Sequence, residues 1–167
     1  MAIRKRTAGD LPACVAVLRR VHELSGYPGR WPDDPAGWLG PSRLMTAWVA
    51  ERDGAIAGHV GLSRGLAARC LLAATGKEPR DLAAIVRLFV DPGARREGLG
   101  RALLGAAVAG ATARSLQPVL DVVDDSHDAI ALYERTGWRL AGRGRATWPG
   151  PDGRKPMLRY YVRAAAG

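Results

Sequence analysis

The feature that most constrains the fold is a strand, a glycine-rich turn, a helix and a second strand in the middle of the chain. Residues 84–90 are apolar and β-branched, residues 100–115 are rich in alanine and leucine, and residues 118–123 form a second apolar run. This order predicts two parallel strands joined by a crossover helix. Hairpin signals on either side, such as Asp53-Gly54, imply antiparallel neighbours and therefore a mixed sheet.

The flanking segments predict the remaining elements from their periodicity and turn residues. The predicted strands cover residues 3–6, 46–51, 55–63, 138–145 and 157–163. The predicted helices cover residues 11–24, 36–39, 65–74 and 126–136. A chain of 167 residues is long enough to bury one core. We therefore expect a single domain over residues 1–167, with a core of about residues 3–163 and a frayed tail at 164–167.

Composition narrows the class of partner. The chain is 47% hydrophobic and 25% charged, and no apolar run is long enough to span a membrane or to form a signal-peptide core. Cys14 and Cys70 match neither metal nor redox spacing. The net charge is +9, but no nucleic-acid motif accompanies it. We expect a cytoplasmic protein with no metal, no membrane contact and no nucleic-acid partner, whose positive field favours an anionic small ligand.

The turn between the central strand and helix carries the first chemical signal. Gly98 and Gly100 let the main chain bend sharply and approach a ligand, and three cations surround them: Arg95, Arg96 and Arg101. The following helix begins with unpaired N–H groups, so the segment forms a cradle for phosphate. Leu103 excludes a dinucleotide fingerprint, and no Gly-Lys-Ser/Thr follows to make a P-loop. By itself the pattern fits equally well a tight connection with solvated arginines.

A second motif follows the strand at residues 118–123. Ser126 is placed to cap a helix, and Ala129, Leu132 and Tyr133 fall on one face of it. Gly137 ends the helix and Trp138 begins the next strand. On this pattern alone Tyr133 is a core or rim aromatic rather than a catalytic group.

Together the two segments resemble the GNAT superfamily of N-acetyltransferases, which use acetyl-CoA. Arg95-x-x-Gly98-x-Gly100 matches the family's Arg/Gln-x-x-Gly-x-Gly/Ala signature, directly after a Leu-x-Val strand. Residues 126–138 match its Asn-x-x-Ala-x-x-Leu-Tyr-x-x-x-Gly-Phe/Trp pattern, with Ser126 in place of Asn. The resemblance implies an α+β fold: α-β-α layers around a mixed, mostly antiparallel sheet with a splayed central parallel strand pair.

The resemblance also implies roles for individual residues. The CoA pyrophosphate would bind the cradle: Arg95, Arg96, Glu97, Gly98, Leu99, Gly100 and Arg101. The pantetheine arm would pair with the main chain of Leu88 and Val90, on either side of Phe89, in a slot opened where the two parallel strands part. An amide near Val90 would polarise the thioester carbonyl. Tyr133 would protonate the leaving thiolate as general acid, a role that suits a phenol of pKa near 10. Ser126 is also a candidate CoA contact, with a hydroxyl where the family often has the amide of asparagine.

The acceptor half is less well specified. A base must deprotonate the amine, either through water or through one of seven side chains: His22, Glu23, Asp33, Asp34, Glu51, His59 and Asp81. Loop residues Tyr27, Trp31 and Trp38, with the aspartates 33 and 34, would suit a small cationic amine. The expected reaction is acetyl transfer from acetyl-CoA to a primary amine of a small molecule. The alternatives are a protein N-terminal or lysine acetyltransferase and a non-catalytic acyl-CoA sensor. A homodimer is left open.

Overall fold

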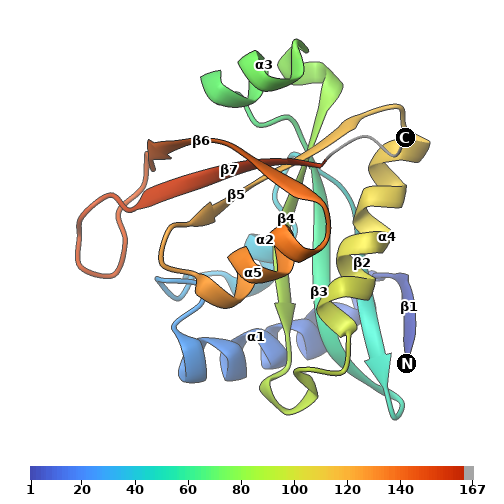
Figure 1. The fold of residues 1–167 in the computed structure, drawn as a ribbon. Coiled ribbons are helices and arrows are strands. Elements are labelled where there is room, and N and C mark those ends of the chain that lie inside the picture. The colour runs from blue at the N-terminus through green and yellow to red at the C-terminus, as the bar shows by residue number, and fades with distance from the viewer. Residues whose placement is uncertain (164–167) are drawn as a thin grey trace. The chain divides into compact units, whose positions relative to one another are not determined.

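The computed structural model describes residues 1–163, so the predicted frayed tail at 164–167 lies outside the described residues. The strands are β1 (Ala2–Lys5), β2 (Leu44–Arg52), β3 (Ala55–Arg64), β4 (Leu82–Val90), β5 (Gln117–Val123), β6 (Trp138–Arg145) and β7 (Met157–Arg163) (Figure 1). The helices are α1 (Leu11–Ser25), α2 (Pro35–Leu39), α3 (Arg69–Thr75), α4 (Leu99–Ala113) and α5 (His127–Arg135), with 3-10 turns η1 (Ala8–Asp10), η2 (Pro79–Asp81) and η3 (Pro92–Ala94). Among these residues no helix is both long and apolar enough to cross a membrane.

The strands form a mixed sheet in the order β1-β2-β3-β4-β5-β7-β6. The β4–β5 pair is parallel and runs from Leu82 opposite Gln117 to Ala84 opposite Val119. The pairs β1–β2, β2–β3, β5–β7 and β6–β7 are antiparallel. The α+β class, the mixed sheet and the central parallel pair are thus confirmed.

The chain divides into two compact units. The first combines Met1–Ser63 with Ile85–Gly110, and the second combines Arg64–Ala84 with Ala111–Gly167. The end of β4, the cradle and most of α4 therefore belong to the first unit. The helix with Tyr133 belongs to the second. That the whole chain acts as a single domain stays a prediction.

Helices cover both faces of the strands in the first unit. Residues of α1 and α2 pack against Val49 and Phe89 in one buried cluster. On β3, Gly58 faces the opposite side, where a Cβ would lie 2.8 Å from Cδ1 of Leu103 on α4. Because neighbouring residues of a strand point to opposite faces, α1 with α2 and α4 lie on different faces of these strands.

In the second unit, helices α3 and α5 contact opposite faces of the β6–β7 hairpin. Cys70 of α3 packs on Gly142, where a Cβ would lie 2.7 Å from the cysteine Cβ. Gly142 is paired with Tyr160. The ring of Tyr133 on α5 lies 6.1 Å from the ring of Tyr161, the residue after Tyr160. The two glycine and tyrosine contacts thus fall on alternate faces of one strand pair.

Element boundaries agree with the predicted ones to within about two residues except at one helix. The helix predicted over residues 65–74 begins only at Arg69. Gly65 has φ of 39° and donates from its N–H to the carbonyl of Leu82, so its conformation is set by a strand contact rather than by a helix. That contact joins residues 17 positions apart in the sequence, and local propensity cannot anticipate it.

Candidate functional site

The cradle starts at a turn that Asp91 organises. The Asp91 N–H donates to the carbonyl of Ala57 at 2.8 Å, which fixes the end of β4 against β3. Its carboxylate accepts from the N–H of Gly93 at 2.9 Å and so caps η3. Arg20 of α1 forms an ion pair with the same carboxylate. Burial opposes ionisation, but these hydrogen bonds together lower the pKa of Asp91 below its ordinary value.

After η3 the main chain bends twice through the left-handed region. Arg96 has φ of 66° and Gly98 has φ of 81°. A side chain at residue 98 would meet nothing within 4 Å, so backbone conformation, not space, calls for glycine there. The same conformation at Arg96 costs about 1–2 kcal/mol, because arginine has a Cβ. Left-handed residues alternating with extended or right-handed ones turn successive N–H groups to one side, which makes an anion-binding concavity.

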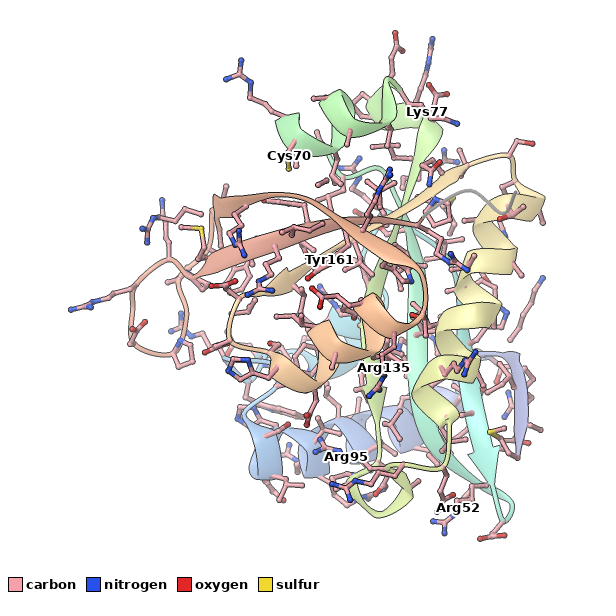
Figure 2. The ribbon with its side chains drawn as sticks, viewed as in Figure 1. Arg52, Cys70, Lys77, Arg95, Arg135 and Tyr161 are labelled. Carbon is pink, nitrogen blue, oxygen red and sulfur yellow. The ribbon has the colours of Figure 1, made fainter. Side chains whose placement is uncertain are left out.

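The cradle is accessible and basic. Residues 95–98 are exposed, whereas Leu99 is buried and anchors the start of α4. Arg95 lies on this loop below α4 in Figure 2. The Ala102 N–H donates to the carbonyl of Gly98 at 3.0 Å. The N–H groups of the preceding helical residues have no partner within the helix and are available to a phosphate.

The end of β4 offers main-chain groups on its outer side. Because the N–H of Asp91 points to β3, the N–H and carbonyl groups of Val90 and Leu88 point away from β3. Phe89 is 4% exposed and packs in the first unit's core. Its side chain is therefore a packing group, and the main chain on either side of it fits the predicted pairing with an extended ligand arm.

A buried polar cluster lies beneath Phe89. The ring of His59 is stacked on Phe89 with 5.2 Å between centroids. Its Nδ1–H donates to the carbonyl of Arg87 at 2.9 Å, and its Nε2 accepts from Arg6 at 2.8 Å. Burial is the main cause that lowers the pKa of His59 to about 4; the hydrogen bond to the Arg87 carbonyl opposes this, and the charges of Arg6 and Arg87 add to it. His59 is thus held neutral, with both nitrogens engaged.

In the second unit, Tyr133 is 7% exposed and belongs to an aromatic cluster. Its ring lies edge-on to Trp138 with 6.1 Å between centroids and tilted against Tyr161. Tyr161 donates from its hydroxyl to Glu134 at 2.8 Å. Figure 2 labels Tyr161, a residue of β7, between that strand and α5. The ring of Tyr133 is thus oriented by two aromatic neighbours.

Ser126 is the N-cap residue of α5 as predicted, but its side chain makes no capping hydrogen bond. The hydrogen bonds of Ser126 come from its main chain. Its N–H donates to the carbonyl of Val123, and its carbonyl accepts from the N–H of Ile130 at 3.0 Å. The prediction that the hydroxyl caps the helix is wrong, because the extended geometry typical of an N-cap is replaced by φ of −81° and ψ of 69°.

Most of the base candidates already have structural partners. Glu51 is paired with Arg4 at 2.8 Å. Asp81 accepts from the N–H of Glu78 at 3.3 Å, and Asp34 caps α2 by accepting from Gly37 at 3.0 Å. His22 donates to the carbonyl of Pro28 at 2.8 Å. With His59 neutral and engaged, these contacts leave the exposed carboxylates of Glu23 and Asp33. No side chain is thereby singled out as the base.

The aromatic loop is covered by cations of the protein itself. The guanidinium of Arg87 lies 3.9 Å from the ring centroid of Trp38, and that of Arg19 lies 4.5 Å from that of Trp31. Arg87 also donates to the carbonyl of Trp38 at 3.3 Å. One face of each indole is therefore occupied by an arginine. The predicted fit to a small cationic amine loses support, because positive charge already lies where such an amine would bind.

Two residues of the site were not anticipated from the sequence. Arg20 and Arg52 contact the cradle from α1 and from the end of β2. They lie 71 and 45 residues from their partners Asp91 and Glu97. Only the Asp91-Pro92-Gly93 turn signal was local, and it marks the capping carboxylate but not its arginine. In the described part of the chain no group of three His, Cys, Asp or Glu side chains is placed to hold a metal ion.

Comparison with known proteins finds similarity to N-acetyltransferases. A curated relative, the ribosomal protein bS18-alanine N-acetyltransferase of Escherichia coli strain K12, is 38% identical over 79 residues, 47% of this chain and 53% of the relative. The chain thus spans about half the length of the curated relatives it matches. A crystal structure of the S18-alanine N-acetyltransferase from Escherichia coli has a TM-score of 0.70 at 25% identity, covering 99% of this chain and 96% of that one.

The fold recurs in a eukaryotic protein. The crystal structure of Arabidopsis thaliana NAA60 in complex with acetyl-CoA has a TM-score of 0.72 at 19% identity, covering 96% of each chain. The model of the acetyltransferase (GNAT) family matches residues 16–138, well over half of the sequence. That range includes the cradle, the end of β4 and the helix of Tyr133. The chain therefore belongs to the acetyltransferase (GNAT) family.

Proposed function

We propose that this protein is an N-acetyltransferase that moves an acetyl group from acetyl-CoA to a primary amine. The observation that carries the proposal is the exposed, basic cradle between β4 and α4, with its two left-handed residues Arg96 and Gly98. The family match and the complex of a protein of this fold with acetyl-CoA support it.

On this proposal the donor is held by main-chain groups and arginines. The amides of residues 96–101 bind the pyrophosphate, with Arg95, Arg96 and Arg101 supplying charge. The outward main-chain groups of Leu88 and Val90 pair with the pantetheine arm as an added strand would. An amide near Val90 polarises the thioester carbonyl, so that the oxyanion of the tetrahedral intermediate is stabilised.

The amine attacks the thioester carbon, and the bond to sulfur breaks as the intermediate collapses. Tyr133 is the proposed general acid, which donates its proton to the departing thiolate. The amine must lose a proton before or during attack. Since most of the candidate carboxylates and histidines already have partners, we propose that water carries that proton to solvent. We also propose that Ser126 contacts CoA through its hydroxyl, which makes no cap hydrogen bond.

The acceptor can be narrowed by observations of two kinds. The relatives named for the alanine of a ribosomal protein favour the α-amine of a protein N-terminus. The aromatic and acidic loop of residues 27–38 is the observation behind a small-molecule amine, although Arg19 and Arg87 occupy one face of Trp31 and Trp38. Both acceptors are primary amines in neutral form, so the donor chemistry is the same for each.

The test is release of the free CoA thiol from acetyl-CoA across a panel of acceptors. The panel contains small monoamines, diamines, amino acids and peptides beginning with alanine, each also supplied with its amine already acetylated as a blank. Turnover with any free amine and none with its blank supports the transferase. Binding of CoA with no turnover on peptides or small amines would support a non-catalytic sensor instead. Failure to bind CoA at all would refute the proposal.

A further inference from the structure

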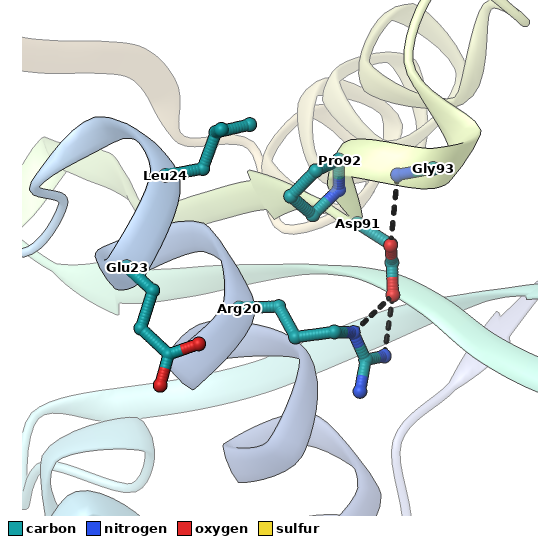
Figure 3. A pocket seen from close by; sticks show the side chains of 6 residues that line it. All are labelled: Arg20, Glu23, Leu24, Asp91, Pro92 and Gly93. Carbon is teal, nitrogen blue, oxygen red and sulfur yellow. Dashed lines mark hydrogen bonds and ion pairs between the residues drawn. The ribbon is translucent and has the colours of Figure 1, made fainter.

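Two carboxylates bracket the basic cradle, and each is paired with an arginine from outside it. Asp91 precedes the loop, and both Nε and Nη2 of Arg20 donate to its Oδ2. Glu97 lies within the loop, and its Oε1 is 2.9 Å from Nη2 of Arg52. Figure 3 shows Arg20 reaching from α1 to Asp91, beside an open pocket of about 380 Å³ that Glu23, Leu24 and Pro92 also line.

The two arginines converge on one residue, Gly93. Its N–H donates to the Asp91 carboxylate that Arg20 holds. Its carbonyl accepts from Nη1 of Arg52 at 3.3 Å. Arg52 therefore contacts the loop near both of its ends, at Gly93 and at Glu97. The labelled positions in Figure 2 place Arg52 near the β2–β3 turn and Arg95 on the loop it braces.

The loop needs such support because its own residues oppose the bound conformation. Arg96 occupies the left-handed region, and the neighbouring cations Arg95 and Arg101 repel it and each other. A strained loop with like charges populates other conformations when free. Apparent affinity for a ligand falls in proportion to the fraction of protein in the competent state.

Glu97 adds an electrostatic reason. A carboxylate in the cradle repels a bound pyrophosphate unless its charge is balanced. In this structure the balance comes from Arg52, whose guanidinium lies between the carboxylates of Glu97 and Asp53, the latter at 3.8 Å. Removing Arg52 would release the loop and leave Glu97 negative beside the ligand.

We infer that Arg52 and Arg20 are positioning residues for donor binding: they hold the cradle in its pyrophosphate-binding conformation, and Arg52 also neutralises Glu97. This inference rests on the proposed function, because it takes the pyrophosphate of CoA as the ligand. Neither arginine touches the reacting atoms. Both act through the loop that binds the donor.

The test compares Arg52→Ala, Arg20→Ala and Arg80→Ala by calorimetric titration with CoA. Arg80 is a matched control, because it forms an ion pair of the same 2.9 Å length with Glu78 in the other unit. We expect Arg52→Ala to lower the affinity for CoA about tenfold and Arg20→Ala to lower it about three- to fivefold, because each variant reduces the fraction of protein whose loop is in the binding conformation. Arg80→Ala should bind CoA within about twofold of the parent protein.

Three further measurements separate positioning from general damage. Dephospho-CoA keeps the pyrophosphate but lacks the 3′-phosphate, so Arg52→Ala should weaken it by the same factor as CoA. S-acetylpantetheine has no phosphate, so its kcat/KM should fall much less than that of acetyl-CoA. The variant Arg52→Ala with Glu97→Gln should recover part of the lost affinity, because the unbalanced carboxylate is gone.

Each outcome supports or overturns the inference. If the parent protein does not bind CoA, the proposed function fails. If the parent binds CoA but Arg52→Ala binds it equally well, the positioning role is wrong. The positioning role is also wrong if Arg52→Ala binds dephospho-CoA as tightly as the parent does. It is equally wrong if kcat/KM falls as much with S-acetylpantetheine as with acetyl-CoA, or if Arg80→Ala loses as much CoA affinity as Arg52→Ala. Equal melting temperatures of the three variants would show that folding does not explain the difference.

Discussion

Acid should destabilise this protein through His59 before its carboxylates are titrated. His59 is fully buried, with Nδ1 donating to the carbonyl of Arg87 and Nε2 accepting from Arg6. Burial lowers its pKa from 6.5 to about 4. His59 therefore becomes protonated below about pH 6.5 in the unfolded chain, but only below about pH 4 in the folded protein. The stability that neutral His59 provides is present above pH 6.5 and is lost as the pH falls toward 4.

The size of the effect follows from the two pKa values. Linkage between protonation and folding gives a loss of about 2 kcal/mol by pH 5 and about 3 kcal/mol by pH 4. Ordinary carboxylates contribute mainly below pH 5, so the interval from 7 to 5 reports on histidine. A loss of this size is a substantial fraction of the roughly 5–15 kcal/mol that stabilises most domains.

The assay is urea unfolding followed by tryptophan fluorescence at several pH values between 7 and 5. The parent protein should lose about 2 kcal/mol over this interval. The variant His59→Gln should be less stable than the parent at pH 7, but its free energy of unfolding should change little between pH 7 and pH 5. The control His127→Gln, at an exposed residue on α5, should show the same dependence of unfolding free energy on pH as the parent protein. A slope in His59→Gln equal to that of the parent would refute the assignment of the acid sensitivity to His59.

Three further substitutions, one of them with a matched control, test other parts of the structure. Tyr133→Phe should lower kcat about 100-fold with CoA affinity within twofold, measured by thiol release and calorimetry; an unchanged kcat would remove Tyr133 as the acid. Gly98→Ala, at φ of 81°, should lower the free energy of unfolding by about 1–2 kcal/mol in thermal unfolding and should weaken the binding of CoA. Gly105→Ala, a helical position that is equally open, should be neutral or slightly stabilising; equal losses at both glycines would contradict the conformational argument. Gly58→Ala places a Cβ 2.8 Å from Leu103 and 3.1 Å from the carbonyl oxygen of Phe89, so we expect about 1–3 kcal/mol lower stability by calorimetry; a neutral result would show that α4 gives way easily.

Much of the fold was predictable because the relevant patterns are local. Alternating and β-branched residues, the Asp53-Gly54 turn and the Gly137 stop mark elements by the chemistry of adjacent residues. The helix at residues 65–74 shows the limit of that approach. The helix begins only at Arg69, and Gly65 instead donates its N–H to the carbonyl of Leu82.

The candidate site divides in the same way. The cradle could be located from its glycines and arginines, since a strand-to-helix turn needs few residues and all are consecutive. The arginines that cover the tryptophans of the loop at residues 27–38 could not be predicted. Trp31 and Trp38 are residues that could line a cation-binding pocket, yet one face of each ring is covered by an arginine, Arg19 from α1 or Arg87 from β4.

The sequence by itself therefore determined the order of elements, the strand-to-helix turn at residues 95–101 and the helix that carries Tyr133. These depend on spacing within one or two turns of chain. Tertiary structure alone decided that His59 is buried and neutral, that Ser126 caps without its hydroxyl, and that Arg52 braces Glu97. Burial and ion pairing are set by which distant residues pack together, because desolvation and Coulomb energy depend on distance in space and not on separation along the chain.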